Sequence, residues 1–168
     1  EGYTFEGWSG TDIKEKDTQV TVTARPLKDR TYTANWKENS YTIVFNVEGE
    51  VTRGEMKNSP LRYTQETTIP KSGYVCGGYK FVGWRTGGKK SEQKVYQPGD
   101  KVSRLCATNN GTVNLYPIWE PCEYTITFDY QTGNKREKVT CKYKETYTFP
   151  TVNRLGWTFE GWSRSAGS

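Results

Sequence analysis

A seven-residue motif occurs three times in the chain, and its spacing constrains the fold more than any other feature of the sequence. The motif reads Gly, Tyr or Trp, any residue, Phe, any residue, Gly, Trp, and it occupies residues 2–8, 78–84 and 156–162. The tryptophans that close it, Trp8, Trp84 and Trp162, are almost evenly spaced along the chain. Self-similarity at a fixed period indicates tandem copies of one small structural unit.

Two further landmarks recur with nearly the same period. A strand-like pair of segments in residues 32–45 returns in residues 115–128, and a segment ending in proline in residues 62–70 returns in residues 142–150. Together the landmarks define a repeat of about 80 residues. Their order predicts the C-terminal half of a first repeat in residues 1–39, a complete second repeat in 40–121 and the N-terminal half of a third in 122–168.

Alternation with a period of two residues predicts strands in each repeat. Residues 41–47 place Tyr, Ile, Phe and Val on one face, and residues 124–130 repeat the pattern with polar residues opposite. A turn at 131–134 is followed by a segment whose Val139 and Cys141 share a face, which predicts a hairpin with a basic outer face. Since no long segment shows a helical period, the fold is predicted to be β-dominated α+β, with several short strands in each repeat.

The glycine before each motif tryptophan has a predicted structural role. In the first copy, Tyr3 and Phe5 share one face of a strand, whereas Trp8 falls on the opposite parity. A β-bulge at Gly7 would return Trp8 to the side of Phe5. The same reasoning applies to Gly83 and Gly161.

The composition favours small aromatic cores and argues against several function classes. Hydrophobic residues make up 33% of the chain and aromatic residues 14%, so Trp and Tyr must supply much of the buried area. The predicted structural aromatic core consists of the tryptophans at repeated positions, Trp8, Trp36, Trp84, Trp119 and Trp162. A net charge of +5 is too weak to indicate nucleic acid, and no apolar run reaches membrane-spanning length.

The chain contains no histidine, which removes the commonest general base and zinc ligand. No nucleophile triad, paired-carboxylate site or phosphate-binding loop is visible either. We therefore predict no catalytic residues, no metal and no cofactor, and a chain that is not an enzyme.

The four cysteines are predicted to form disulfides, because they lack metal-site spacing. Cys122 and Cys141 share the inner face of the predicted hairpin, and Cys76 and Cys106 lie in segments that are longer than their counterparts. The favoured pairs are therefore 122–141 and 76–106, which would stiffen small cores. The alternative is four buried free thiols.

Basic residues cluster around the long loop of the second repeat. A polyanion-binding surface is one interpretation of this cluster, which comprises Lys89, Lys90, Lys94, Lys101 and Arg104. The other interpretation is a charged edge that prevents aggregation, and the interleaved Glu92 and Asp100 favour it.

Three segments of the chain resemble the Listeria–Bacteroides repeat, the B-repeat of the internalin B type. They are residues 2–8, residues 115–119 (Leu-Tyr-Pro-Ile-Trp) and residues 124–129 (Tyr-Thr-Ile-Thr-Phe-Asp). The resemblance implies tandem small ubiquitin-like β-grasp repeats and a place in secreted or wall-anchored bacterial proteins. Trp157 replaces the usual Tyr, and Pro117 stands where Ala is expected.

These observations predict a structural role at a bacterial cell surface or cell wall. The first hypothesis is a stalk or spacer in an adhesin, whose partners are the neighbouring repeats of the same chain. The second is a binding module whose basic loop docks cell-wall or host glycans, or a host surface protein.

Overall fold

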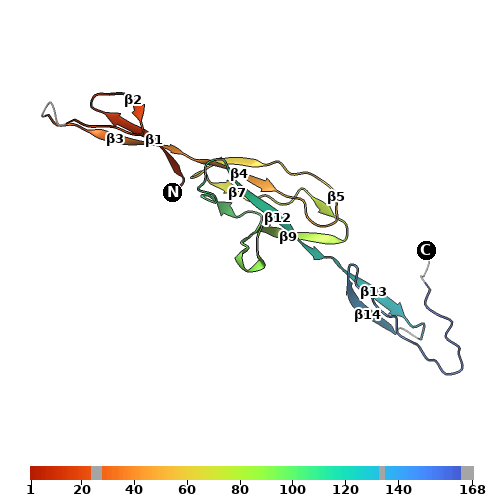
Figure 1. Ribbon diagram of the computed structural model, residues 1–168. Coiled ribbons are helices and arrows are strands. Elements are labelled where there is room, and N and C mark those ends of the chain that lie inside the picture. Colours follow the sequence, from red (N-terminus) through yellow and green to blue (C-terminus); the bar gives the residue numbers. More distant parts are fainter. Residues whose placement is uncertain (24–27, 133–134, 164–168) are drawn as a thin grey trace. The chain divides into compact units, whose positions relative to one another are not determined.

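The computed structural model describes residues 1–23, 28–132 and 135–163, and its regular secondary structure consists almost entirely of strands (Figure 1). Within the described residues, the only helix is one 3-10 turn, η1 (Lys90–Glu92). This confirms the prediction of a β-dominated fold. The chain forms two compact units, Glu1–Glu120 and Pro121–Ser168.

The first unit begins with a three-stranded antiparallel sheet in the order β2-β1-β3. Its strands are β1 (Tyr3–Gly10), β2 (Ile13–Asp17) and β3 (Tyr32–Glu38). The register between β1 and β3 skips one residue between Phe5 and Gly7, and Gly7 has a φ of 123°. A bulge therefore lies where the sequence predicts it. An added Cβ at Gly7 would lie 2.8 Å from the backbone of Asp17.

The same unit continues into a five-stranded sheet in the order β10-β9-β12-β4-β6 (Figure 1). Its strands are β4 (Ser40–Phe45), β6 (Ser59–Arg62), β9 (Tyr79–Thr86), β10 (Val95–Tyr96) and β12 (Gly111–Pro121). β12 runs parallel to β4, and β6 runs antiparallel to β4. The parallel pair joins the two ends of the second repeat.

Two short strand pairs flank this sheet. β5 (Val51–Arg53) pairs with β8 (Val75–Cys76), and β7 (Thr67–Thr68) pairs with β11 (Lys101–Val102). The segment between β6 and β9 contains β7 and β8 and no helix, and its Ile69 and Tyr74 pack into the core.

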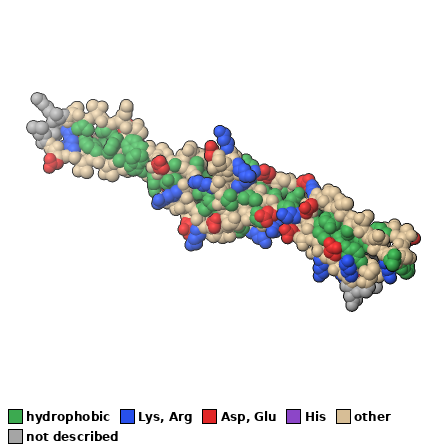
Figure 2. Space-filling model, turned by 90° about the horizontal axis from the view of Figure 1, so that it is seen from below, with side chains coloured by type: hydrophobic (Ala, Val, Ile, Leu, Met, Phe, Trp, Pro, Cys, Tyr) green, Lys and Arg blue, Asp and Glu red, His purple; other side chains and the backbone are tan. Residues whose placement is uncertain are grey.

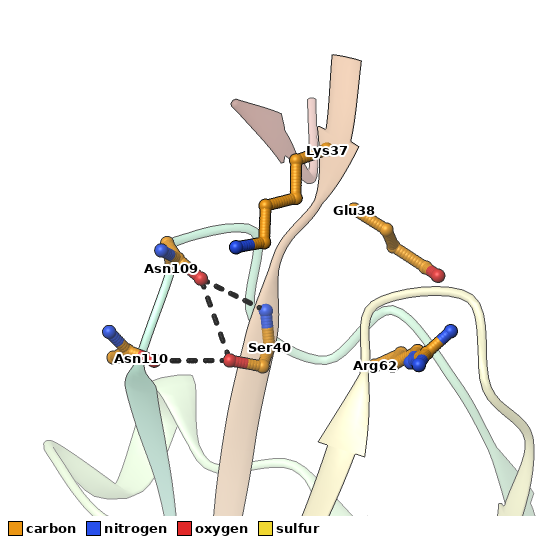
Figure 3. Close-up of a pocket in the computed structure, with 6 residues that line it drawn as sticks. All are labelled: Lys37, Glu38, Ser40, Arg62, Asn109 and Asn110. Atoms are coloured by element: carbon orange, nitrogen blue, oxygen red, sulfur yellow. Dashed lines mark hydrogen bonds between the residues drawn. The ribbon is translucent and has the colours of Figure 1, made fainter. Parts of the chain in front are cut away.

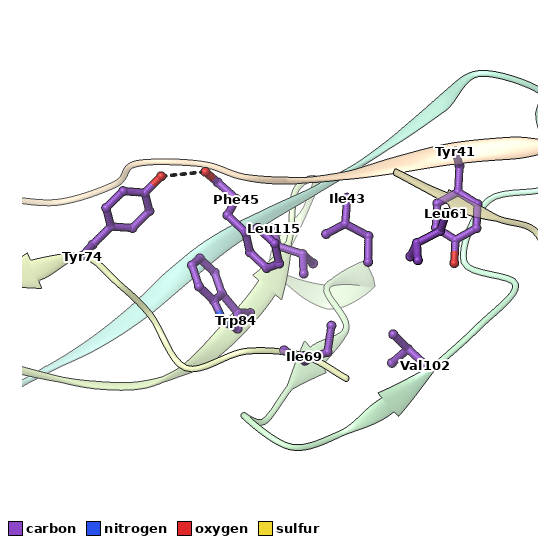
Figure 4. Close-up of a cluster of buried hydrophobic side chains, with 9 residues drawn as sticks. All are labelled: Tyr41, Ile43, Phe45, Leu61, Ile69, Tyr74, Trp84, Val102 and Leu115. Atoms are coloured by element: carbon purple, nitrogen blue, oxygen red, sulfur yellow. Dashed lines mark hydrogen bonds between the residues drawn. The ribbon is translucent and has the colours of Figure 1, made fainter. Parts of the chain in front are cut away.

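The core of the second repeat lies on one face of β4 and is shown in Figure 4. Its buried side chains are Tyr41, Ile43, Phe45, Leu61, Ile69, Tyr74, Trp84, Val102 and Leu115. The predicted alternation in β4 is therefore confirmed for Tyr41, Ile43 and Phe45. The prediction that Val47 shares this face is wrong: β4 ends at Phe45, and Val47 is 60% exposed.

The second unit contains the predicted hairpin, formed by β13 (Glu123–Asp129) and β14 (Arg136–Lys142). Phe128 and Cys141 are buried, whereas Lys138 and Lys142 are exposed, as the alternation predicts. Gly133 and Asn134 of the predicted turn lie outside the described residues. The hairpin therefore presents its basic face to solvent.

The two units repeat the same local geometry around their motif tryptophans. Trp84 Nε1 donates to the carbonyl of Pro70 at 2.8 Å, and Trp162 Nε1 donates to the carbonyl of Pro150 at 2.9 Å. The ring of Trp84 lies 4.9 Å from that of Phe45. The ring of Trp162 likewise lies 4.9 Å from that of Phe128. The recurring sequence therefore builds a recurring local structure. In both units, the indole N–H donates a hydrogen bond to the carbonyl of the proline that ends the preceding segment.

Candidate functional site at the joint between the first two repeats

A single buried asparagine connects the three-stranded sheet to the second repeat. Asn39 lies between β3 and β4, is 6% exposed and is the buried polar residue of the described chain. Its amide nitrogen donates to the carbonyl of Ala107 at 2.7 Å, and its amide oxygen accepts from the hydroxyl of Thr4 at 2.5 Å. Its backbone N–H donates to the carbonyl of Gly2 at 2.9 Å, and its backbone carbonyl accepts from the N–H of Tyr63 at 2.9 Å. All four polar groups of Asn39 are thus satisfied, two by each side of the joint.

Two more contacts hold the same joint. Gly2 adopts a φ of 76°, and an added Cβ there would lie 2.0 Å from the ring of Tyr63. The rings of Tyr3 and Tyr63 meet edge to face, with centroids 6.2 Å apart. Only glycine permits this approach, since it combines a left-handed backbone with no side chain.

The carboxylate of Glu38 adds a polar contact on the outside of the joint. It accepts hydrogen bonds from the backbone N–H of Thr64, at 2.7 Å, and from the Thr64 hydroxyl. These bonds, chiefly the one from the hydroxyl, hold the pKa of Glu38 below its ordinary value. The contact is therefore complete at neutral pH, and it weakens as the pH falls through that lowered pKa.

An open pocket lined by charged and polar residues lies beside this joint (Figure 3). It has a volume of about 420 Å³ and is lined by Lys37, Glu38, Ser40, Arg62, Asn109 and Asn110. Asn109 Oδ1 accepts from the backbone N–H of Ser40 at 3.2 Å. Asn110 Oδ1 accepts from the hydroxyl of Ser40 at 3.1 Å. The two amide oxygens therefore face Ser40 and the amide nitrogens point away from it (Figure 3).

The side chains of this joint are not repeated at the corresponding residues of the next copy, 120–123. Aligning Trp119 with Trp36 places Cys122 at the position of Asn39, Glu120 at that of Lys37 and Pro121 at that of Glu38. The backbone contact is repeated, because Tyr143 N–H donates to the carbonyl of Cys122 at 2.8 Å. Sequence reasoning missed Asn39, although comparing the two copies reveals it as a polar residue without a counterpart.

The tryptophans predicted to form the aromatic core differ in burial. Trp84 is fully buried, and Trp119 packs against the core of the second repeat. Trp162 is partly exposed and contacts Phe128. Trp8 and Trp36 pack against Phe5 but are 37% and 60% exposed. Trp84 is covered by the rings of Phe45 and Tyr74. The sheet of β1, β2 and β3 contains no counterpart of these two residues, which is why Trp8 is more exposed than Trp84.

The predicted disulfides are absent, because all four cysteines are free thiols. Cys76 pairs with Val51, and this pair lies beyond the Phe45 end of β4. Cys106 packs beside Gly111, which pairs with Tyr41 at the other end of β4. Four residues of strand separate these ends by about 13 Å, too far for a disulfide.

The second predicted pair fails for reasons of register. Tyr124 lies directly opposite Cys141, and Cys122 is bonded through its carbonyl to Tyr143. Cys122 and Cys141 are therefore diagonal neighbours and not a directly facing pair. Shared parity placed them correctly on one face, but it did not fix which residues are opposite.

We expect thiol labelling to follow burial. Cys106 and Cys122 are partly exposed, whereas Cys76 and Cys141 are buried. Iodoacetamide should therefore modify the first two in the native protein and all four after unfolding without a reductant. Peptide mass mapping measures this, and two thiols that resist alkylation in denaturant would contradict it.

The basic residues predicted to form one surface lie on different elements. Lys89, Lys90 and Lys94 lie on the connection between β9 and β10. Lys101 lies in β11, where it pairs with Glu66 at 3.1 Å, and Arg104 follows β11 and donates its N–H to Tyr63. Figure 2 shows acidic and basic side chains interspersed on the visible face. The three lysines of the loop remain as the candidate basic surface.

The described part of the chain contains neither a candidate metal-binding cluster nor a candidate membrane-spanning helix. Among the described residues, no group of three or more His, Cys, Asp or Glu side chains is arranged to hold a metal ion. No helix in the described part of the chain is long and apolar enough to cross a membrane.

The recurring strands, indole hydrogen bonds and aromatic pairs define the chain as a tandem-repeat protein with small β-rich units. The profile of the Listeria–Bacteroides repeat domain matches residues 41–116 and 124–168. The profile of the divergent InlB B-repeat domain matches residues 1–40. The chain belongs to the Listeria–Bacteroides repeat family, which confirms the resemblance noted in the sequence.

Individual relatives match the chain over only part of their own length. A protein described as a Gly-rich membrane protein from Evansella cellulosilytica is 26% identical over 96% of this chain, which spans 19% of that relative. Internalin H from Listeria monocytogenes is 32% identical over 54% of this chain and 16% of its own length. No solved structure matches the chain significantly. The chain thus spans less than a quarter of the length of each of these relatives.

Proposed function

We propose that the chain is a non-catalytic stalk segment of an extracellular bacterial surface protein, in which it holds another domain away from the cell. The observation that carries this proposal is the joint at Asn39. A spacer holds a distal domain in a defined position only when neighbouring repeats are fixed to each other. Asn39 forms hydrogen bonds to both the first sheet and the second repeat. Its partners are then the adjoining repeats, and its place is the cell surface or cell wall.

We further propose that the second repeat is a β-grasp-like unit, as the family resemblance implies. The parallel pair of β4 and β12 joins the first and last strands of the repeat, with β6 and β9 on either side. In this repeat, extended chain containing β7 and β8 takes the place of the helix that crosses a β-grasp sheet.

The stalk role is tested by separating length from sequence in the parent protein. Deletion of residues 40–121 should reduce antibody access to the domain displayed on intact cells. Replacement of the same residues by a repeat of equal length from a relative should restore access. A length-matched repeat that fails to restore it would contradict the stalk role and favour a specific binding role.

The alternative function is a binding module whose basic loop docks a polyanionic glycan or a host surface protein. Lys89, Lys90 and Lys94 support it, since none of them forms an ion pair with another described residue. Clustered unpaired cations attract polyanions in a salt-dependent manner.

Charge reversal of the loop separates the two functions. The stalk role predicts that Lys89→Glu, Lys90→Glu and Lys94→Glu together leave display of the distal domain unchanged. The binding role predicts that this variant loses its retention on heparin at about 0.15 M salt. A control with the same charge change replaces exposed lysines elsewhere in the first unit, Lys14, Lys57 and Lys71. Equal loss of retention in both variants would contradict a specific role for the loop.

A further inference from the structure

We infer that the pocket beside the joint of the first two repeats binds an acidic sugar residue of a glycan. The site is distinct from the basic loop, and the inference does not depend on the stalk role. It follows from which hydrogen-bonding groups of the pocket are already used and which remain.

The oxygen acceptors of the pocket are mostly occupied by the protein itself. Ser40 engages the side-chain oxygens of Asn109 and Asn110. Thr64 engages Glu38 through two hydrogen bonds to one carboxylate oxygen. Because a backbone N–H can donate to an amide oxygen but not to an amide nitrogen, the bond from Ser40 fixes the amide of Asn109 with its nitrogen outward.

The groups that remain are donors and cations. The amide nitrogens of Asn109 and Asn110 donate to no other described residue, and neither Lys37 nor Arg62 forms an ion pair within the described chain. With Glu38 the formal charge of the lining is one positive unit. A guanidinium and an ammonium beside amide donors match a carboxylate or sulfate group.

The size of the pocket and its remaining hydrogen-bonding groups favour a sugar as the carrier of that anion. The volume of about 420 Å³ falls within the range of small-ligand sites. The second carboxylate oxygen of Glu38 is left to accept from a hydroxyl, and the amides donate to ring or hydroxyl oxygens. A free inorganic anion such as sulfate could use the cations and the amide donors, but it would supply no hydroxyl to the free oxygen of Glu38.

The lining residues also differ from their counterparts in the next copy, which separates them from the structural positions of the repeat. Glu120 stands at the position of Lys37 and Glu123 at that of Ser40. Lys142 corresponds to Arg62 when the prolines that end the two segments are aligned, so it preserves one charge without the rest of the set. This gives a matched control within the same chain.

The test follows backbone amide shifts by NMR during titration of the whole chain with a heparin tetrasaccharide. Shifts are expected at Ser40, Tyr63 and Asn110, with saturation. Arg62→Gln should weaken the apparent affinity at these amides about 5- to 10-fold, while the control Lys142→Gln should change it less than about 2-fold. Shifts at Lys89 and Lys90 report the loop separately and should survive Arg62→Gln.

Four outcomes would overturn the inference. The amides of the joint could fail to shift, Arg62→Gln could match its control, or inorganic sulfate could reproduce the same shifts at the same concentration. The last result would assign the pocket to a free anion. A neutral maltotetraose serves as the further control, and equal binding of it would remove the acidic requirement. None of these results bears on the length-dependent test of the stalk.

Discussion

Replacement of Trp84 by alanine is expected to lower the free energy of unfolding of the second repeat by about 3–5 kcal/mol, the usual cost of removing a buried Trp. Trp84 has 0% exposure and contacts the rings of Phe45, Tyr74 and Phe81. It also donates a hydrogen bond to Pro70. A loss of this size is comparable to the whole stability of a small domain, so urea denaturation followed by tryptophan fluorescence should show an unfolded or barely folded second repeat.

The matched control is Trp36→Ala, which removes the same side chain from a position that is 60% exposed. Its ring contacts Phe5 with centroids 5.2 Å apart, so we expect a loss of no more than about 1 kcal/mol. Trp84→Phe keeps an aromatic ring but removes the indole donor. Its loss in the free energy of unfolding should lie between those of Trp84→Ala and Trp36→Ala. Equal losses for Trp84→Ala and Trp36→Ala would contradict the placement of the core.

Replacement of Asn39 by alanine is expected to uncouple the first sheet from the second repeat without unfolding the latter. The change removes the donor to Ala107 and the acceptor for Thr4, at a cost of about 1–3 kcal/mol for polar groups left without partners. The effect should be local, since Asn39 lies outside the apolar core. Hydrogen exchange should therefore accelerate in β1 and β3 and remain slow in β4 and β12.

Asn114→Ala is the matched control for this prediction. Its side chain is exposed, and its amide oxygen accepts a hydrogen bond from Asn46. We expect a change within about 0.5 kcal/mol and unaltered exchange in β1. Asn39→Cys reproduces the residue that the second copy carries at Cys122 and should behave like the alanine variant. Slow exchange in β1 in both Asn39 variants would show that the joint does not depend on this side chain.

The repeat and strands such as β4 and β13 could be predicted from the sequence because both are local patterns. The alternation of Tyr41, Ile43 and Phe45 fixes which side of β4 faces the core. The parity conflict between Phe5 and Trp8 points to a bulge at Gly7, which the structure contains. In each case the information lies within a few consecutive residues.

The pairing of distant segments could not be predicted from the same patterns. The parallel register of Gly111 with Tyr41 joins the start and the end of the second repeat, and it places Cys106 at the opposite end of β4 from Cys76. The 122–141 disulfide failed similarly, because alternation assigns a face to a residue and leaves the register open. A disulfide between strands can therefore be predicted only when the register of the strands is known.

The candidate site depends on still less local information. The pocket assembles Lys37 from the end of β3, Ser40 from the start of β4, Arg62 from the end of β6 and two asparagines from the turn before β12. The sequence contains one signal for it, which is the difference between the two copies at Asn39 and Lys37. Residues common to all copies maintain the fold, whereas residues that differ can carry a role specific to one repeat.

The central claim is that the first sheet and the second repeat are coupled through the joint at Asn39. Residual dipolar couplings of the backbone amides in weakly aligned protein test this coupling directly. The couplings of β1 and β3 should fit the same alignment tensor as those of β4 and β12. Two tensors of different magnitude would show that the two parts move independently, and this result would contradict both the joint and the stalk role that rests on it.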